Sequence, residues 1–180
     1  MSLLAGLKVP TGATRRKTPD GERFETEHQP GTGSLDPLVG LAASKHWGWW
    51  SLDGNVLHQF STRGAQHTEL GDRTSINLAL GYSLTGEEHH HDGEGAAPHG
   101  HANWSLFMEA NAEREGRQKI DGTAEADSGG RVLYLAPGAR FTAASGWSAA
   151  FSAGVPIWQH IRRSHPDNAF RLTLAVSKSF

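Results

Sequence analysis

The stretch "DRTSINLALGYSL", residues 72–84, alternates apolar side chains with polar or small ones along most of its length. A period of two predicts a β-strand with one apolar and one polar face, because successive side chains of a strand point to opposite sides. The apolar set is Ile76, Leu78, Leu80, Tyr82 and Leu84, and the other set is Ser75, Asn77, Ala79, Gly81 and Ser83.

The same alternation recurs on both sides of this stretch and ends at the last residue, in "FRLTLAVSKSF" at 170–180. Because no helical period is convincing, we predict an all-β chain of about eight antiparallel strands. Strands of globular proteins have about five or six residues, whereas strands that cross a membrane need about nine to eleven. Most predicted strands have the longer length, and they are 3–9, 35–46, 49–61, 72–84, 104–114, 131–143, 146–158 and 170–180.

The predicted connections differ in length at the two ends of the strands. Short turns alternate with longer loops, the turns at 47–48 and 144–145 and the loops at 62–71, 115–130 and 159–168. Short turns at one rim and long loops at the other are typical of outer-membrane barrels. We therefore predict a single domain over residues 1–180, an antiparallel up-and-down transmembrane β-barrel.

The composition of the 180 residues excludes several classes of protein. The net charge of −2 argues against a broad basic surface for nucleic acid. The absence of cysteine excludes disulfides, thiolate metal sites and thiol catalysis. No run approaches the roughly 20 apolar residues of a membrane helix. The start "MSLLAGLKVPTG" lacks the basic region of a signal peptide.

Several motifs together carry a resemblance to a known family. They are "GLKVPTG" (6–12), "PGTGSLD" (30–36), "GDRTSINLALGY" (71–82), "SGGRVLYLAPGAR" (128–140), "PIWQ" (156–159) and the strand that ends on Phe180. In this order they resemble the outer-membrane barrels of the MetA-pathway of phenol degradation family, which is transporter-like. The resemblance implies a bacterial outer-membrane location and a transport role, and it brings no catalytic site.

Members of that family usually have a signal peptide and further strands before the segment matching "GLKVPTG", so the resemblance implies a chain truncated at its N-terminus. It also implies that Phe180 is the assembly signal read by the barrel assembly machinery. In such barrels the last strand pairs with the first, which leaves no open edge. If the chain is complete, the strand at 3–9 therefore has to pair with the strand at 170–180.

A His-rich insert, "TGEEHHHDGEGAAPHGHAN", occupies residues 85–103. Imidazole together with carboxylate suits Cu, Zn or Ni, and the candidate metal ligands are His89, His90, His91, His99 and His101. The alternation of rims places this insert on the periplasmic side, where it would suit metal efflux or tolerance. The alternative is a polar loop that binds metal weakly and adventitiously, because its Gly-rich backbone is not preorganised.

Polar residues on the wet faces of the predicted strands form a candidate lumen lining, which filters solutes by charge. They are Asp53, Asn55, Gln59, Asn77, Glu109, Asn111, Glu113, Arg140 and Arg171. The alternative is a network that fills a narrow barrel, because eight strands enclose little space beyond their own side chains. Nothing else supports Glu109 and Glu113 as a hydrolytic pair, so we do not expect an enzyme.

The six tryptophans, with Tyr82, fall mostly near strand ends, where a membrane barrel has its aromatic girdles. The alternative is ordinary core tryptophan in a soluble β-sandwich. The direction of the apolar faces distinguishes the two. A membrane barrel should direct outward the side chains of Leu78, Leu80, Leu106, Leu133, Phe151, Leu172 and Leu174.

The function that we predict is transport or export of small solutes, either aromatic or metal-related, across the outer membrane. The expected partners are outer-membrane lipid, the barrel assembly machinery and the solutes, with no nucleic acid and no cofactor. Two alternatives stay open: a closed structural barrel with a metal-binding loop, and a soluble lipocalin-like β-barrel binder.

Overall fold

The computed structural model describes residues 1–85, 102–162 and 168–179. Eight long strands dominate it. They are β1 (Ser2–Lys8), β2 (Asp36–Trp47), β3 (Trp50–Gln59), β5 (Arg73–Ser83), β6 (Asn103–Glu115), β9 (Gly130–Thr142), β10 (Trp147–Ile161) and β11 (Arg171–Lys178). Each of them overlaps one predicted strand, so the all-β prediction is confirmed.

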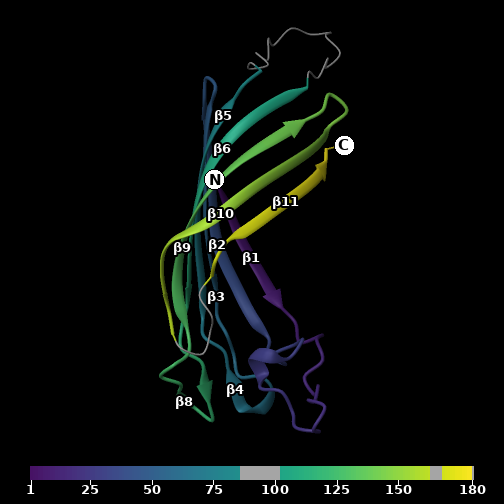
Figure 1. The fold of residues 1–180 in the computed structure, drawn as a ribbon, viewed down its shortest axis with the longest axis vertical. Helices are drawn as coiled ribbons and strands as arrows, with labels where there is room; N and C mark the ends of the chain where they lie inside the picture. The colour runs from purple at the N-terminus through teal and green to yellow at the C-terminus, as the bar shows by residue number, and fades with distance from the viewer. Residues whose placement is uncertain (86–101, 163–167, 180) are drawn as a thin grey trace.

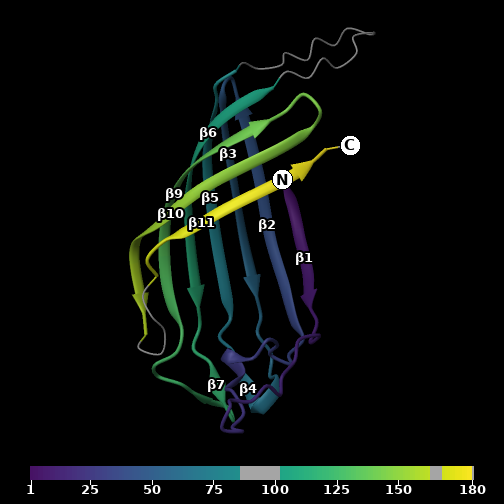
Figure 2. The ribbon, with the colours of Figure 1, turned by 45° about the vertical axis from the view of Figure 1, so that its right-hand side comes forward.

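The eight long strands form one antiparallel sheet in the order β1-β2-β3-β5-β6-β9-β10-β11. Each strand therefore pairs with the long strands before and after it, which is an up-and-down meander. The sheet is curved and twisted, and β1 and β11 form its two edges (Figure 1 and Figure 2). Within the described ranges these edges do not pair, so the sheet is open and barrel closure is not shown.

Five short elements lie in the loops at one end of the sheet (Figure 2). They are the 3-10 helices η1 (Thr26–His28) and η2 (Ala65–His67) and the strands β4 (Thr68–Glu69), β7 (Lys119–Ile120) and β8 (Thr123–Ala124). The strands form a small sheet in the order β4-β7-β8, which ties two long loops together. The prediction of plain loops at 62–71 and 115–130 is wrong for these residues, because two-residue strands have no detectable alternation.

The ion pairs of Arg63 with Asp121 and of Lys119 with Glu69 join these loops, and the second is the shorter. Lys119 Nζ lies 2.7 Å from Glu69 Oε1. The hydrogen bond to this carboxylate, reinforced by its charge, raises the pKa of Lys119. The Lys119–Glu69 pair is exposed, so it links the two loops without burying any side chain.

The register of the sheet sorts all eight strands into two faces. Residues directly opposite one another across neighbouring strands share a face, and the register gathers most large apolar side chains on one face and most polar ones on the other. The apolar face comprises Val39, Leu41, Leu52, Val56, Ile76, Leu78, Leu80, Leu106, Met108, Leu133, Leu135, Phe151, Val155, Leu172, Leu174 and Val176. The polar face comprises Asp36, Asp53, Asn55, Ser75, Asn77, Ala79, Glu109, Asn111, Glu113, Tyr134, Ser152 and Arg171 among others.

Burial is inverted relative to a water-soluble protein. Among the described residues the buried hydrophobic side chains are Val132, Tyr134 and Ala136, all on the polar face. The apolar face is open: Leu78 is 52% exposed, Phe151 50% and Leu174 75%. No second sheet covers this face within the described part of the chain.

The two ends of the sheet carry different connections. At the short-turn rim, 48–49 joins β2 to β3, 84–102 joins β5 to β6, and 143–146 joins β9 to β10. At the long-loop rim, the connections are 9–35, 60–72, 116–129 and 162–170. Because the strands alternate in direction, β1 begins and β11 ends on the side of the short-turn rim. The helices of the described part are too short to span a membrane.

Candidate functional site

The structure brings all the residues predicted to line a lumen onto the polar face. They come from β3, β5, β6, β9 and β11, and are Asp53, Asn55, Gln59, Asn77, Glu109, Asn111, Glu113, Arg140 and Arg171. They do not form one cluster. Instead eight of them divide into four groups at different heights along the strands, and Arg140 lies apart from these groups, near the Phe107 ring.

The first group is a ladder of three asparagines at one level. Asn77 on β5 pairs with Asn55 on β3 and with Asn111 on β6. Its Nδ2 donates to Asn55 Oδ1 at 2.9 Å, and Asn111 Nδ2 donates to Asn77 Oδ1 at 3.0 Å. Asn77 and Asn111 each donate one of these bonds and Asn55 accepts one, so the ladder is a stripe of amide groups across three strands.

The second group is an ion pair over an aromatic ring. Arg171 Nη2 donates to Glu113 Oε1 at 2.6 Å, and its guanidinium carbon lies 4.2 Å from the centroid of the Tyr134 ring. Tyr134 is only 3% exposed because this cation covers it. The arrangement crosses the hollow side of β6, β9, β10 and β11 and holds these strands at a fixed curvature.

The third group, around Asp36, was missed at the sequence level. Asp36 is 2% exposed and its Oδ2 accepts from Lys8 Nζ at 2.5 Å, while its Oδ1 accepts from the Thr62 backbone N–H at 2.9 Å. Ser34 Oγ and Gln59 Nε2 also donate to it, at 3.1 and 3.2 Å. Lys8 belongs to the motif "GLKVPTG", and Ser34 and Asp36 belong to the motif "PGTGSLD". The presence of both motifs in one chain was the feature of the sequence that could have indicated this contact.

The same two motifs also meet through their glycines. A Cβ added at Gly31 would come within 2.6 Å of the Gly12 backbone, and one added at Gly12 would come equally close to Gly31. Only glycine permits this crossing of two chain segments. The glycines of the two motifs therefore bring the beginning and the end of the 9–35 loop together.

The fourth group lies midway along the strands and holds unpaired charges. Asp53 and Glu109 flank Ala79 on the neighbouring strands. Neither carboxylate has an ion-pair partner in the described part of the chain, in contrast to Asp36, Glu113 and Glu115. The centre of the polar face therefore carries two uncompensated negative charges.

The polar face is hollowed near each rim. One cavity of about 630 Å³ lies toward the long-loop rim and is lined by Gln59, Ser75, Glu113 and Val132 among others. Another of about 710 Å³ lies toward the short-turn rim and is lined by Ser51, Ser83, Ser105 and Arg140 among others. Between them Phe107 packs over Gly138, where a Cβ would collide with its ring, and Arg140 lies 5.9 Å from the Phe107 centroid.

The aromatic residues border the apolar face. All six tryptophans are between 42% and 53% exposed, so they do not form the core of a sandwich. At the short-turn rim the rings of Trp50 and Tyr82 lie 4.9 Å apart and are tilted by 60°, and Trp104 lies 5.0 Å from Phe141. At the long-loop rim Phe60 packs edge-on against His58 at 4.4 Å.

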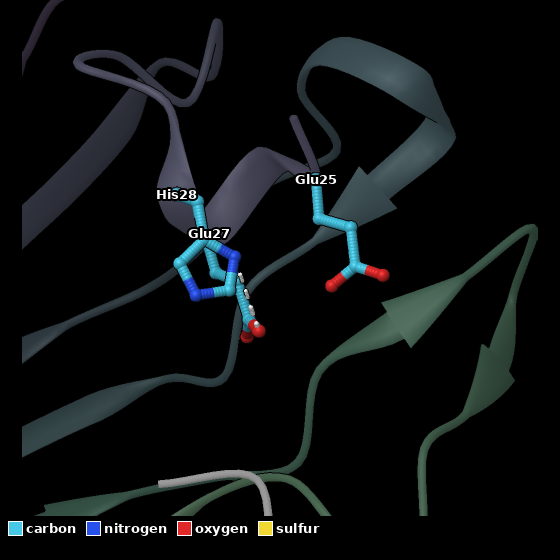
Figure 3. Close-up of side chains that lie close together, drawn as sticks. All are labelled: Glu25, Glu27 and His28. Atoms are coloured by element: carbon cyan, nitrogen blue, oxygen red, sulfur yellow. Dashed lines mark ion pairs between the residues drawn. The ribbon is translucent and has the colours of Figure 1, made fainter. Parts of the chain in front are cut away.

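A further acidic cluster lies in the 9–35 loop, at η1. The ligand atoms of Glu25, Glu27 and His28 all lie within 4.8 Å of one another (Figure 3). His28 Nδ1 is 3.8 Å from Glu27 Oε1. Glu25 and His28 are exposed. The three side chains are close because they leave one short turn, and we assign no metal to them.

Two predicted sites lie outside the described residues. These are the metal ligands His89, His90, His91, His99 and His101, and the assembly signal Phe180. The metal site and the assembly signal stay predictions. The strands that flank the insert, β5 and β6, do meet at the short-turn rim.

Comparison of the chain with known protein families, with curated proteins and with solved structures found no match. The family resemblance of the motifs therefore stays a prediction, and the function has to be argued from the geometry alone.

Proposed function

We propose that this chain forms the wall of a bacterial outer-membrane β-barrel that passes small polar solutes. The apolar face would contact lipid and the polar face would line the lumen. This is the role that the transporter-like family resemblance implies. The observation that carries the proposal is the inverted burial of the sheet, with its large apolar side chains exposed and its polar face hollowed.

The dimensions of the apolar face suit a bilayer. Trp147 and Trp158 border it at opposite ends of β10. Eleven residue steps of roughly 3.3 Å, tilted by about 45°, correspond to about 25 Å across the membrane. That is the height of the apolar band in outer-membrane barrels, and the flanking aromatic residues match their girdles.

The edges of the sheet support closure in the membrane. An unpaired backbone group in lipid costs several kcal/mol, so only closed barrels and helices span bilayers. With eight alternating strands, β1 and β11 run antiparallel, and the two edges therefore have compatible directions. Both carry apolar residues on the same face, among them Leu3 and Leu7 on β1 and Leu172 and Leu174 on β11.

The polar face suggests which solutes pass. Amide side chains and hydroxyls offer hydrogen bonds without strong charge, which suits small polar solutes. The unpaired carboxylates of Asp53 and Glu109 attract cations. We therefore infer a weak preference for cations over anions.

The experiment expresses the chain behind a cleavable signal sequence in a Gram-negative host. The protein should fractionate with the outer membrane and migrate differently on a gel before and after boiling. Reconstituted into a planar bilayer, it should then show steady conductance, which the boiled sample lacks. A folded membrane protein without conductance would favour the closed structural barrel, and a soluble protein would refute the membrane location as well.

A further inference from the structure

The polar face carries side chains of both signs, whereas the charged side chains of the apolar face are all cations. The carboxylates of the eight long strands, namely Asp36, Asp53, Glu109, Glu113 and Glu115, lie on the polar face. The charged residues of the apolar face are cations: Lys45, Arg114, Arg131 and Lys178. Arg114, Arg131 and Lys178 lie at or next to the ends of their strands, whereas Lys45 lies opposite Leu52 within the apolar band. No carboxylate of the long strands shares their face.

At the long-loop rim Arg114 and Arg131 lie within a continuous row of polar side chains. The register pairs His58 with Thr74, Thr74 with Arg114, Arg114 with Arg131, and Arg131 with His160. Each residue lies one position from the rim end of its strand, on β3, β5, β6, β9 and β10 in turn. We call these five residues the cationic row. The rim ends of the five strands can be followed in Figure 2.

The centre of the cationic row is electrostatically unfavourable by itself. Arg114 and Arg131 are directly opposite each other, and like charges at opposed positions of a sheet destabilise it. Both side chains are exposed, and neither has an ion pair in the described part of the chain. Nearby Arg73, on the polar face, is instead paired with Glu115 at 3.2 Å.

The cationic row lies immediately beyond the apolar band. Two residues further from the rim, the same register gives Val56, Ile76, Ala112, Leu133 and Trp158. Along each of these strands the apolar face therefore changes from apolar side chains to the cationic row, with Arg114 and Arg131, within two residues. That is the level of lipid head groups, where Phe60 and Trp158 also provide interfacial aromatic rings.

We propose that the cationic row binds the phosphate groups of a phosphorylated glycolipid in the outer leaflet. The inference rests on the proposed membrane orientation, in which long loops face outward. Arginine guanidinium groups match phosphate oxygens through two parallel hydrogen bonds. Thr74 and the two imidazoles add hydrogen-bonding groups, and the acyl chains would lie on the apolar face beneath. An anion between Arg114 and Arg131 would remove their repulsion.

The lysines at the short-turn rim provide a matched control. Lys178 lies 5.8 Å from the Trp147 ring and donates to the Ser145 carbonyl, so its charge is already engaged within the chain. Lys45 is isolated from other cations by its apolar neighbour Leu52. Replacing both lysines removes the same charge as replacing both arginines, without touching the cationic row.

The test uses the full chain folded in neutral detergent micelles, with folding checked by the gel shift on boiling. Binding of diphosphoryl lipid A is measured by native mass spectrometry. Arg114→Gln with Arg131→Gln should weaken binding by roughly tenfold to thirtyfold. Arg114→Lys with Arg131→Lys keeps both charges and should retain most of the binding. Lys45→Gln with Lys178→Gln should bind like wild type. Fully dephosphorylated lipid A should bind wild type as weakly as the double Gln variant binds the phosphorylated form.

Two results with the variants would overturn the proposal. One is unchanged lipid binding in the double Gln variant, and the other is an equal loss in the lysine variant, which would indicate a general charge effect. Competition by millimolar inorganic phosphate would point to free phosphate as the ligand instead and would likewise overturn it. If the double variant fails to fold, the single Arg131→Gln variant replaces it. Conductance plays no part in this assay, so failure of transport and failure of lipid binding are distinguished.

Discussion

Arg171 Nη2 on β11 lies 2.6 Å from Glu113 Oε1 on β6, although two strands separate β11 from β6 in the sheet. The side chain of Arg171 reaches its partner across the ring of Tyr134 on β9. Such a contact requires the polar face to be hollow, because a flat sheet would hold the two strands too far apart. The contact between Arg171 and Glu113 therefore depends on the curvature of the sheet, and it helps to hold the sheet in that curvature.

We expect the Arg171–Glu113 pair to stabilise the fold by a modest amount. The two side chains are 39% and 42% exposed, so solvent screens the charges. A double-mutant cycle with Arg171→Met and Glu113→Gln should give a coupling free energy of about 1 kcal/mol in urea unfolding from vesicles. The rim pair Arg73–Glu115 is the control and should couple less. A value near zero for Arg171 and Glu113 would mean that they do not fix the curvature.

The contact around Asp36 should matter more. Lys8→Met would leave this carboxylate, 2% exposed, without its cation. Because Thr62, Ser34 and Gln59 still donate to it, we expect the free energy of unfolding to fall by about 2 kcal/mol. Lys119→Met removes an exposed ion pair of similar length and should leave that free energy nearly unchanged. Equal effects of the two variants would contradict the structural role of Asp36.

The sequence was sufficient for the strands and their faces, because alternation is a local property. The predicted strand at 72–84 corresponds to β5 (Arg73–Ser83), and its two sets of side chains do lie on opposite faces. The prediction did not extend to which polar residues meet. Asn55, Asn77 and Asn111 join only through the register of three strands. A shift by two residues would keep every face and break every one of these contacts.

Other features depend on the sheet as a whole and could not be predicted from any one segment. Glu113 and Arg171 were both predicted to lie on the wet side, but their contact depends on curvature accumulated over four strands. No role was predicted for Asp36, because its partners come from two strands and two loops that are separated in the sequence. The cationic row was invisible for the same reason: Arg114 and Arg131 become neighbours only once β6 and β9 are aligned.

Two adjacent residues of β5 can test which face contacts lipid. Leu78 is 52% exposed in the middle of the apolar face, while Ala79 lies between Asp53 and Glu109 on the polar face. Leu78→Arg should lower the free energy of unfolding in vesicles by about 2 to 4 kcal/mol, the cost of arginine at the bilayer midplane. Ala79→Arg should be tolerated, because two carboxylates flank it. A larger loss of unfolding free energy for Ala79→Arg than for Leu78→Arg would mean that the polar face, and not the apolar face, contacts lipid.

The unpaired carboxylates should set the ion preference of the lumen. Replacing Asp53 with Asn and Glu109 with Gln removes both charges while keeping the size of the side chains. The reversal potential across a KCl gradient should then move toward zero or toward anions, because the centre of the polar face loses its negative charge. Asn55→Ser alters the same surface without altering charge and should leave the potential unchanged. An unchanged reversal potential in the variant that lacks both carboxylates would mean that other residues set the ion selectivity.

Closure of the sheet can be tested at its two edges. Ala5 on β1 and Leu174 on β11 both lie on the apolar face, and the chain has no native cysteine to interfere. If the edges pair antiparallel within one chain, Ala5→Cys and Leu174→Cys should form a disulfide in the membrane, with neighbouring positions tested for register. Ala5→Cys with Thr173→Cys is the matched control, because Thr173 is on the polar face and its thiol would point to the other side of the wall. Cross-links within one chain would establish an eight-stranded barrel. Cross-links between chains, or none in a folded sample, would show that each edge pairs with a different strand and that the lumen is wider than eight strands enclose.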